Sequence, residues 1–254
     1  MEFDYNFTLL LMIFMRMSGC ILFNPILGRK NLPTIFQIGL TLMLTLFTYP
    51  LVPAQALEIP NFFIFFIVAL KELMVGFLIG FVIMMFMSLI QISGEMMDMQ
   101  LGISMSRVYD PSSNISMPLS ASYVNVMFIL IFFCANGHLT LIQIFTKLCQ
   151  VVPYGEQFPQ FTVFQDIVGM FSLVLIYAVK ISLPVLAAEF ITEIAVGLVM
   201  RAVPQIDVFT VSIQLKVIIG FAVILILVPP LATFLERLIN LMFDNINHIF
   251  SAFV

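Results

Sequence analysis

Residues 62–92 read FFIFFIVALKELMVGFLIGFVIMMFMSLIQI, and this stretch decides the fold class. Its only charged residues are Lys71 and Glu72, and at about 1.5 Å per residue a helix of this length exceeds the ~30 Å hydrocarbon core of a bilayer. The rest of the chain is similar, because 62% of the 254 residues are apolar, 9% are charged and the mean hydropathy is +1.14. A soluble domain carries roughly 25% charged residues. The sequence therefore predicts an all-α integral membrane protein.

Further apolar segments that are long enough to cross a bilayer lie on both sides of this stretch. Six hydrophobic helices or long hairpin arms are predicted, at residues 7–27, 35–57, 62–92, 124–148, 167–199 and 208–243. A continuous helix over 167–199 would be about 50 Å long, which is more than a bilayer requires. Helices that simply run up and down through a membrane therefore fit this sequence poorly.

Charged side chains fall inside several of these segments. Each would cost roughly 2.5–3.5 kcal/mol at a lipid-facing helix centre, so we expect them to face protein, water or one another. They include Arg16, Lys71, Glu72, Lys180, Glu189, Glu193 and Lys216.

Two of these charges are expected to pair. If the last two apolar segments form a hairpin with its tip at Pro204-Gln205, Glu193 and Lys216 both lie 11 or 12 residues from the tip. We predict a buried ion pair between them. Two roles are open, a structural pair between helices or part of a proton or ion relay. The structural role is favoured because no regular array of acids lines a path.

The stretch from residue 93 to residue 122 is unusually polar for this chain. It contains Glu95, Asp98, Arg107 and Asp110, followed by the turn signal Pro111-Ser112-Ser113-Asn114. Glu95 and Asp98 lie one helical turn apart, which is typical of a solvated or subunit-facing helix end.

No motif in the sequence indicates an enzyme, a metal site or a cofactor site. Nucleophile motifs, Gly-rich phosphate loops and paired catalytic acids are missing, and His138 and His248 have no acidic or cysteine companion at ligand spacing. Cys20, Cys134 and Cys149 show no CxxC spacing and are expected to be buried free thiols. A net charge of −4 with only ten Lys and Arg residues argues against nucleic-acid binding.

Short motifs recur along most of the chain. The middle of the chain contains Gly94-Glu95, Gln100-Leu101-Gly102, Asp110-Pro111 and Met117-Pro118. The most specific stretch is RAVPQIDVF at residues 201–209, which contains Arg201, Pro204 and Gln205, with Lys216 downstream. Two further motifs are Asn24-Pro25-Ile26-Leu27-Gly28 and Asn136-Gly137-His138-Leu139. Together these motifs resemble the FliR family, a subunit of the flagellar type III export gate that is similar to the corresponding injectisome subunit.

The resemblance implies a subunit of the export gate in the bacterial inner membrane, within the flagellar basal body and partly above the bilayer. It implies a FliP-like helical part at residues 1–165, including the 93–122 loop, and a FliQ-like helical hairpin with a C-terminal tail at 166–254. The implied partners are FliP-like, FliQ-like, FlhB-like and FlhA-like subunits, together with unfolded protein substrates. No cofactor is implied.

The 93–122 loop matches the family's plug loop in position. A gate that is closed to small molecules needs an apolar and deformable constriction, and methionine suits this because it is flexible. The residues expected to seal the pore are Ile103, Met105, Val108, Tyr109, Ile115 and Met117. Without the resemblance, an ordinary loop folded onto its own subunit would be preferred.

The alternative function is a stand-alone, ion-coupled secondary transporter. It would use Lys180, Glu189, Glu193 and Lys216 near the membrane midplane. No inverted repeat with matched broken helices is found in the two halves of the sequence, which argues against this class.

Overall fold

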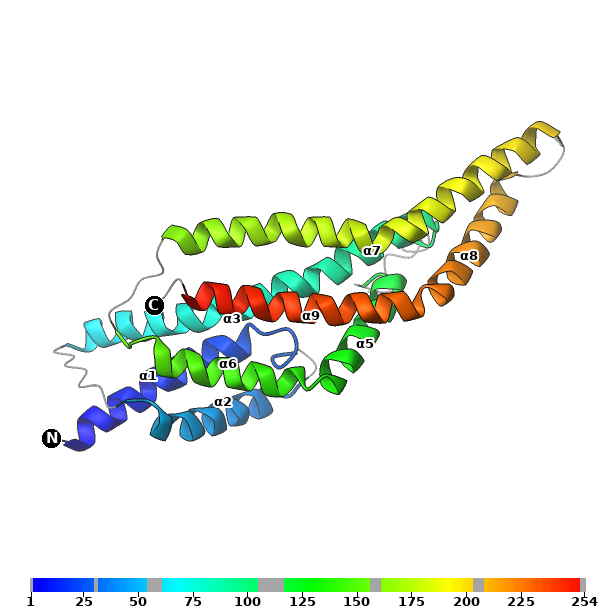
Figure 1. Cartoon of the computed structure of the whole chain (residues 1–254). Helices are drawn as coiled ribbons and strands as arrows, with labels where there is room; N and C mark the ends of the chain where they lie inside the picture. Colours follow the sequence, from blue (N-terminus) through cyan, green and yellow to red (C-terminus); the bar gives the residue numbers. More distant parts are fainter. Residues whose placement is uncertain are drawn as a thin grey trace. The chain divides into compact units, whose positions relative to one another are not determined.

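The computed structural model describes residues 2–29, 32–53, 61–104, 117–155, 161–202 and 208–251. Within these residues the regular structure is helical, which confirms the all-α prediction (Figure 1). The elements are α1 (Glu2–Leu22), α2 (Thr34–Thr48), the 3₁₀ helix η1 (Tyr49–Leu51), α3 (Phe62–Gln100), α5 (Leu119–Cys134), α6 (Gly137–Val151), α7 (Phe161–Ala202), α8 (Val208–Ile226) and α9 (Val228–Ser251).

Two predicted continuous segments are broken in the structure. The segment 124–148 divides into α5 and α6 at Asn136, which adopts the left-handed φ of 57° that asparagine tolerates better than most residues. The segment 208–243 divides into α8 and α9 next to Pro229-Pro230, which lack the N–H groups that would continue the hydrogen bonding of α8. The prediction of single helices over these two segments is therefore wrong.

Among the described residues, three helical stretches are long and apolar enough to cross a membrane. They are Thr34–Leu51, Phe62–Gln100 and Val163–Ala202, and the number rises to five if each of two bent helix pairs counts as one span. The membrane-protein prediction is confirmed at this level. The two longest stretches contain 39 and 40 residues, so the expectation of helices that exceed a bilayer also agrees with the structure.

The chain divides into two compact units, each built from separate stretches of sequence. The first comprises residues 1–86, 136–170 and 240–254, and the second comprises residues 87–135 and 171–239. The predicted FliP-like and FliQ-like parts, with a boundary after residue 165, rest on resemblance and remain a prediction.

In the first unit, α1 contacts α2 and α6 and crosses the N-terminal half of α3. At the crossing, a Cβ added to Gly76 would collide with the carbonyl oxygen of Arg16, and one added to Gly19 would collide with that of Leu73. Only glycine permits two helix backbones to approach this closely. Gly76 and Gly80 form the GxxxG spacing, and Gly80 lies against Phe23, which directly follows α1.

In the second unit, the end of α3 packs on the beginning of α5, and the C-terminal part of α7 lies beside α8 (Figure 1). Gly94 on α3 is in backbone contact with Ala121 on α5. Pro184 lies inside α7, where it removes one backbone hydrogen bond without ending the helix.

Candidate functional site

Asp98 at the end of α3 holds the beginning of α5. Its Oδ2 accepts a hydrogen bond of 2.6 Å from the Leu119 backbone N–H, and its Oδ1 accepts bonds of 3.1 Å and 2.5 Å from the N–H and hydroxyl of Ser120. Because the residue before α5 is Pro118, no local side chain caps this helix. A carboxylate from another helix thus satisfies the free N–H groups and the positive end of the helix dipole.

This contact ties together the two ends of the segment that the sequence identifies as a candidate plug. Asp98 and Gly94 precede the segment, whereas Leu119, Ser120 and Ala121 follow it. Asp98 is fully buried within the single chain, so the expectation of a solvated or subunit-facing helix end is wrong for this residue. The physical reason is the α5 N-terminus, which supplies donors that water would otherwise provide.

The predicted plug residues lie mostly outside the described residues. Met105, Val108, Tyr109 and Ile115 fall there, as do the motif residues Asp110 and Pro111. Ile103 and Met117 are described and are partly exposed at the two ends of the segment. Gly102 adopts a φ of 77°, in the left-handed region that favours glycine, directly after α3 ends.

Lys216 and Glu193 face each other across α8 and α7. Lys216 Nζ lies 3.5 Å from Glu193 Oε1, and the side chains are 16% and 57% exposed. Within this chain the pair is therefore partly open, whereas a buried pair was expected. Arg201 is exposed at the end of α7, and the motif residues Pro204 and Gln205 lie outside the described residues.

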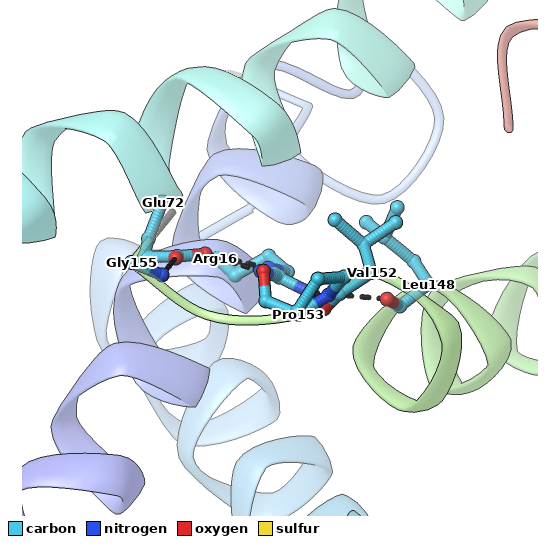
Figure 2. Close-up of polar contacts among 6 residues, drawn as sticks. All are labelled: Arg16, Glu72, Leu148, Val152, Pro153 and Gly155. Carbon is cyan, nitrogen blue, oxygen red and sulfur yellow. Dashed lines mark hydrogen bonds and ion pairs between the residues drawn. The ribbon is translucent and has the colours of Figure 1, made fainter. Parts of the chain in front are cut away.

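A second charged site, which the sequence did not reveal as a pair, lies in the first unit (Figure 2). Arg16 on α1 and Glu72 on α3 are 0% and 3% exposed, with Arg16 Nη2 2.6 Å from Glu72 Oε2. Arg16 lies three residues before Gly19 and Glu72 lies four residues before Gly76. The close helix crossing therefore brings the two charges together.

The remaining donors of Arg16 bind carbonyl groups at the end of α6 and in the turn that follows it. Nη1 donates to the carbonyl oxygens of Leu148 and Val152 at 3.1 Å and 2.8 Å, and Nη2 donates to that of Pro153 at 3.3 Å. Glu72 Oε1 accepts a 3.0 Å bond from the Gly155 N–H (Figure 2). Because both charges are paired and hydrogen-bonded, the network suits a structural clamp better than acid–base chemistry.

Tyr154 completes this clamp. The Arg16 guanidinium carbon lies 3.9 Å from the centre of the Tyr154 ring, within the range of a cation–π interaction. Burial raises the pKa of the Tyr154 hydroxyl above its ordinary value, so the group stays neutral at physiological pH.

The histidines and cysteines show no metal-binding arrangement in the described part of the chain. His248 Nδ1 lies 3.5 Å from Asp166 Oδ2 at an exposed position. Cys20 and Cys149 are buried free thiols, as expected. Cys134 is exposed, so the expectation for this residue is wrong, because its position near the end of α5 lies off the packed face.

Residues 7–242 match the family described as bacterial export proteins, family 1. The chain belongs to this family. Membership of an export-protein family confirms the predictions that the chain is a transport component and not an enzyme.

Individual members of the family are similar to this chain along nearly its whole length. The flagellar biosynthetic protein FliR of Escherichia coli (strain K12) is 27% identical over 93% of this chain and 90% of its own length. FliR of Bacillus subtilis (strain 168) is 27% identical over 96% and 95%, and the Yop proteins translocation protein T of Yersinia pestis is 26% identical over 95% and 93%. The family thus includes flagellar relatives and a relative from a translocation system.

Proposed function

We propose that this chain is the FliR-type subunit of a flagellar type III export apparatus in the bacterial inner membrane. The match over residues 7–242 carries the proposal, and the flagellar relatives span nine-tenths or more of this chain. The long apolar helices agree with a membrane location. Helices that exceed the bilayer agree with a subunit that is enclosed partly by other proteins.

The proposed partners are FliP-like, FliQ-like, FlhB-like and FlhA-like subunits. Much of α7 is apolar and exposed in the single chain, including Phe190, Ile191, Ile194 and Leu198. A surface of this kind must be covered by lipid or by neighbouring subunits. The partly open pair of Glu193 and Lys216 lies between α7 and α8 and favours protein neighbours, since charges are costly against lipid.

Mild detergent extraction of the affinity-tagged full chain, followed by native mass spectrometry, tests this assembly. We expect a large complex that contains other small hydrophobic subunits. A chain that purifies alone and moves ions or solutes in liposomes would instead support the stand-alone secondary transporter.

Within the gate, the segment between α3 and α5 is proposed to close the pore. Its two ends are fastened by Asp98 and by the contact of Gly94 with Ala121. The apolar residues Ile103, Met105, Val108, Tyr109, Ile115 and Met117 would form the seal.

Deleting residues 106–116 tests the seal. Cells that overproduce the complex with this deletion are expected to leak small ions, because the apolar constriction is removed. The control is the double substitution Ser112→Ala and Ser113→Ala, which keeps the length and the apolar residues and should leave the membrane tight. A tight membrane with the deletion, in a complex that still assembles, would argue against a plug.

A further inference from the structure

The packed face of α7 contains an acid. On the C-terminal part of this helix the buried residues include Val185, Glu189, Thr192 and Val196, which recur every three or four residues. Glu189 is 0% exposed. Glu193, one turn later, does not belong to this buried face, and its side chain is 57% exposed. Two acids on one helix thus lie in different surroundings.

Glu189 packs against a glycine of α8. A Cβ added to Gly220 would lie 3.1 Å from Glu189 Oε1 and would collide with Leu101 Cδ2 at the end of α3. The carboxyl group therefore sits where α3, α7 and α8 meet, beside a backbone and an apolar side chain. At this position water is excluded from the carboxyl group, and few polar groups are available to replace the hydrogen bonds that water would make.

Neither oxygen of Glu189 has a hydrogen-bond partner among the described residues. An ionised carboxylate in this position would lose its hydration without gaining a donor, which is strongly unfavourable. A protonated carboxyl group is neutral and avoids the larger part of this cost. The geometry of this chain therefore favours the neutral form of Glu189.

The charged groups that act on Glu189 are Lys216 on α8 and Glu193 on α7. Lys216 already pairs with Glu193 at 3.5 Å. On α3, the acid nearest to Leu101 along the helix is Asp98, whose oxygens bind the beginning of α5. With Glu189 protonated, the charges of Lys216, Glu193 and Glu189 sum to zero, whereas loss of the proton leaves one negative charge.

We propose that Glu189 is a proton-binding site and that its proton controls which acid Lys216 pairs with. When the proton leaves, the carboxyl O–H bond breaks, water accepts the proton and the electron pair remains on Glu189. Lys216 then swings from Glu193 to Glu189, a move of about one helical turn, or ~5.4 Å, which its flexible side chain can make. The ligand of this site is thus a proton, and the response is a change of ion pair between α7 and α8.

Infrared spectroscopy of the purified full chain in lipid vesicles tests the proton site without any export assay. At pH 7 we expect the carbonyl band of a protonated carboxyl group, moving to lower frequency in D₂O. The band should be missing in Glu189→Gln and unchanged in Glu236→Gln, an exposed acid on α9. Isotope labelling of glutamate, but not of aspartate, should shift the band in the unaltered chain.

The pairing of Lys216 is tested by two further variants. In Glu193→Gln, Lys216 has lost its partner, so it should stabilise ionised Glu189 and lower the pH at which half of the band disappears by about one unit, a tenfold weaker proton affinity. In Lys216→Gln the band should persist to higher pH. A band that titrates at the same pH in both variants would show that neither charge acts on Glu189 and would overturn the exchange of partners.

The outcomes that overturn the proton site are specific. A wild-type chain without the band at pH 7, or a band that survives Glu189→Gln, would exclude it. Glutamine has the size and neutrality of protonated glutamate, so Glu189→Gln should assemble as the wild type does. Loss of folding in this variant would itself show that the charged form is needed.

Discussion

Replacing Arg16 by methionine should strongly destabilise the first unit. Methionine fills a similar volume but removes the positive charge and every donor of the guanidinium group. Among the described residues, Glu72, which is 3% exposed, would then keep only the Gly155 N–H as a partner for its negative charge.

The magnitude follows from the groups left without partners. Stranding one member of a buried ion pair costs roughly 3–5 kcal/mol, and the orphaned carbonyl oxygen of Val152 adds about 1 kcal/mol or more. The carbonyl oxygen of Leu148 keeps a 3.2 Å backbone bond from the Val152 N–H, so it adds little. The free energy of unfolding should therefore fall by about 4–6 kcal/mol in total.

Thiol labelling in mild detergent measures this loss. Cys20 and Cys149 are buried in the same unit and react only when it opens, whereas exposed Cys134 is replaced by serine to remove its signal. At about 1.4 kcal/mol per tenfold change, Arg16→Met should speed the labelling roughly a thousandfold or more. Arg237→Met, at an exposed position on α9, is the matched control and should change the free energy by under about 0.5 kcal/mol.

The double variant Arg16→Met with Glu72→Met decides whether the buried charge is the cause. Removing both charges should recover about 3 kcal/mol of the loss, because an ion pair replaced by apolar side chains leaves no charge stranded. A single variant that labels as slowly as the wild type would refute the reasoning. A double variant no more stable than the single one would show that the carbonyl bonds, and not the charge, hold the clamp.

Three further changes test the other contacts. Asp98→Asn should lower the free energy of unfolding of the second unit by about 1–2 kcal/mol in a denaturant titration, because it weakens the cap on α5, and an unchanged midpoint would contradict that role. Gly76→Ala should cost about 1–3 kcal/mol through backbone overlap, while Gly39→Ala, with open space around its Cβ, should be neutral or stabilising in the same titration. Glu193→Lys combined with Lys216→Glu should restore the complex that either single substitution loses on native gels, and failure of that rescue would exclude pairing of the two side chains.

Hydropathy predicted the helices well because burial in a bilayer depends on local composition. It missed the ends of α5 and α8 because both breaks lie inside apolar stretches. The signals were present in the sequence, in Asn136-Gly137 for the first break and Pro229-Pro230 for the second. Backbone preferences of single residues therefore overruled hydrophobicity at these points.

The polar residues were harder to interpret. The sequence shows that Arg16 and Glu72 are each too costly to face lipid. It does not show that they pair, because 56 residues separate them and the periodicity of one helix does not predict which residues of a second helix it will contact. Asp98 was interpreted from its neighbour Glu95, although its partners lie 21 and 22 residues later. The proline before α5, where a capping serine or threonine is usual, was the available hint that a distant acceptor is needed.

By itself the sequence determined that the chain lies in a membrane, that it is helical and which family it belongs to. These conclusions depend on the length of apolar runs, on the scarcity of charged residues and on short motifs, all of which are local features of one chain. The tertiary structure decided which charged side chains form pairs, and it left the carboxyl group of Glu189 without a hydrogen-bond partner among the described residues. Gly19 and Gly76 allow α1 and α3 to approach closely enough for Arg16 to contact Glu72, and the missing side chain of Gly220 leaves room for the carboxyl group of Glu189. Glu189 and Glu193 are four residues apart on one helix, yet only the packing of α3 and α8 against α7 encloses the first and leaves the second beside Lys216.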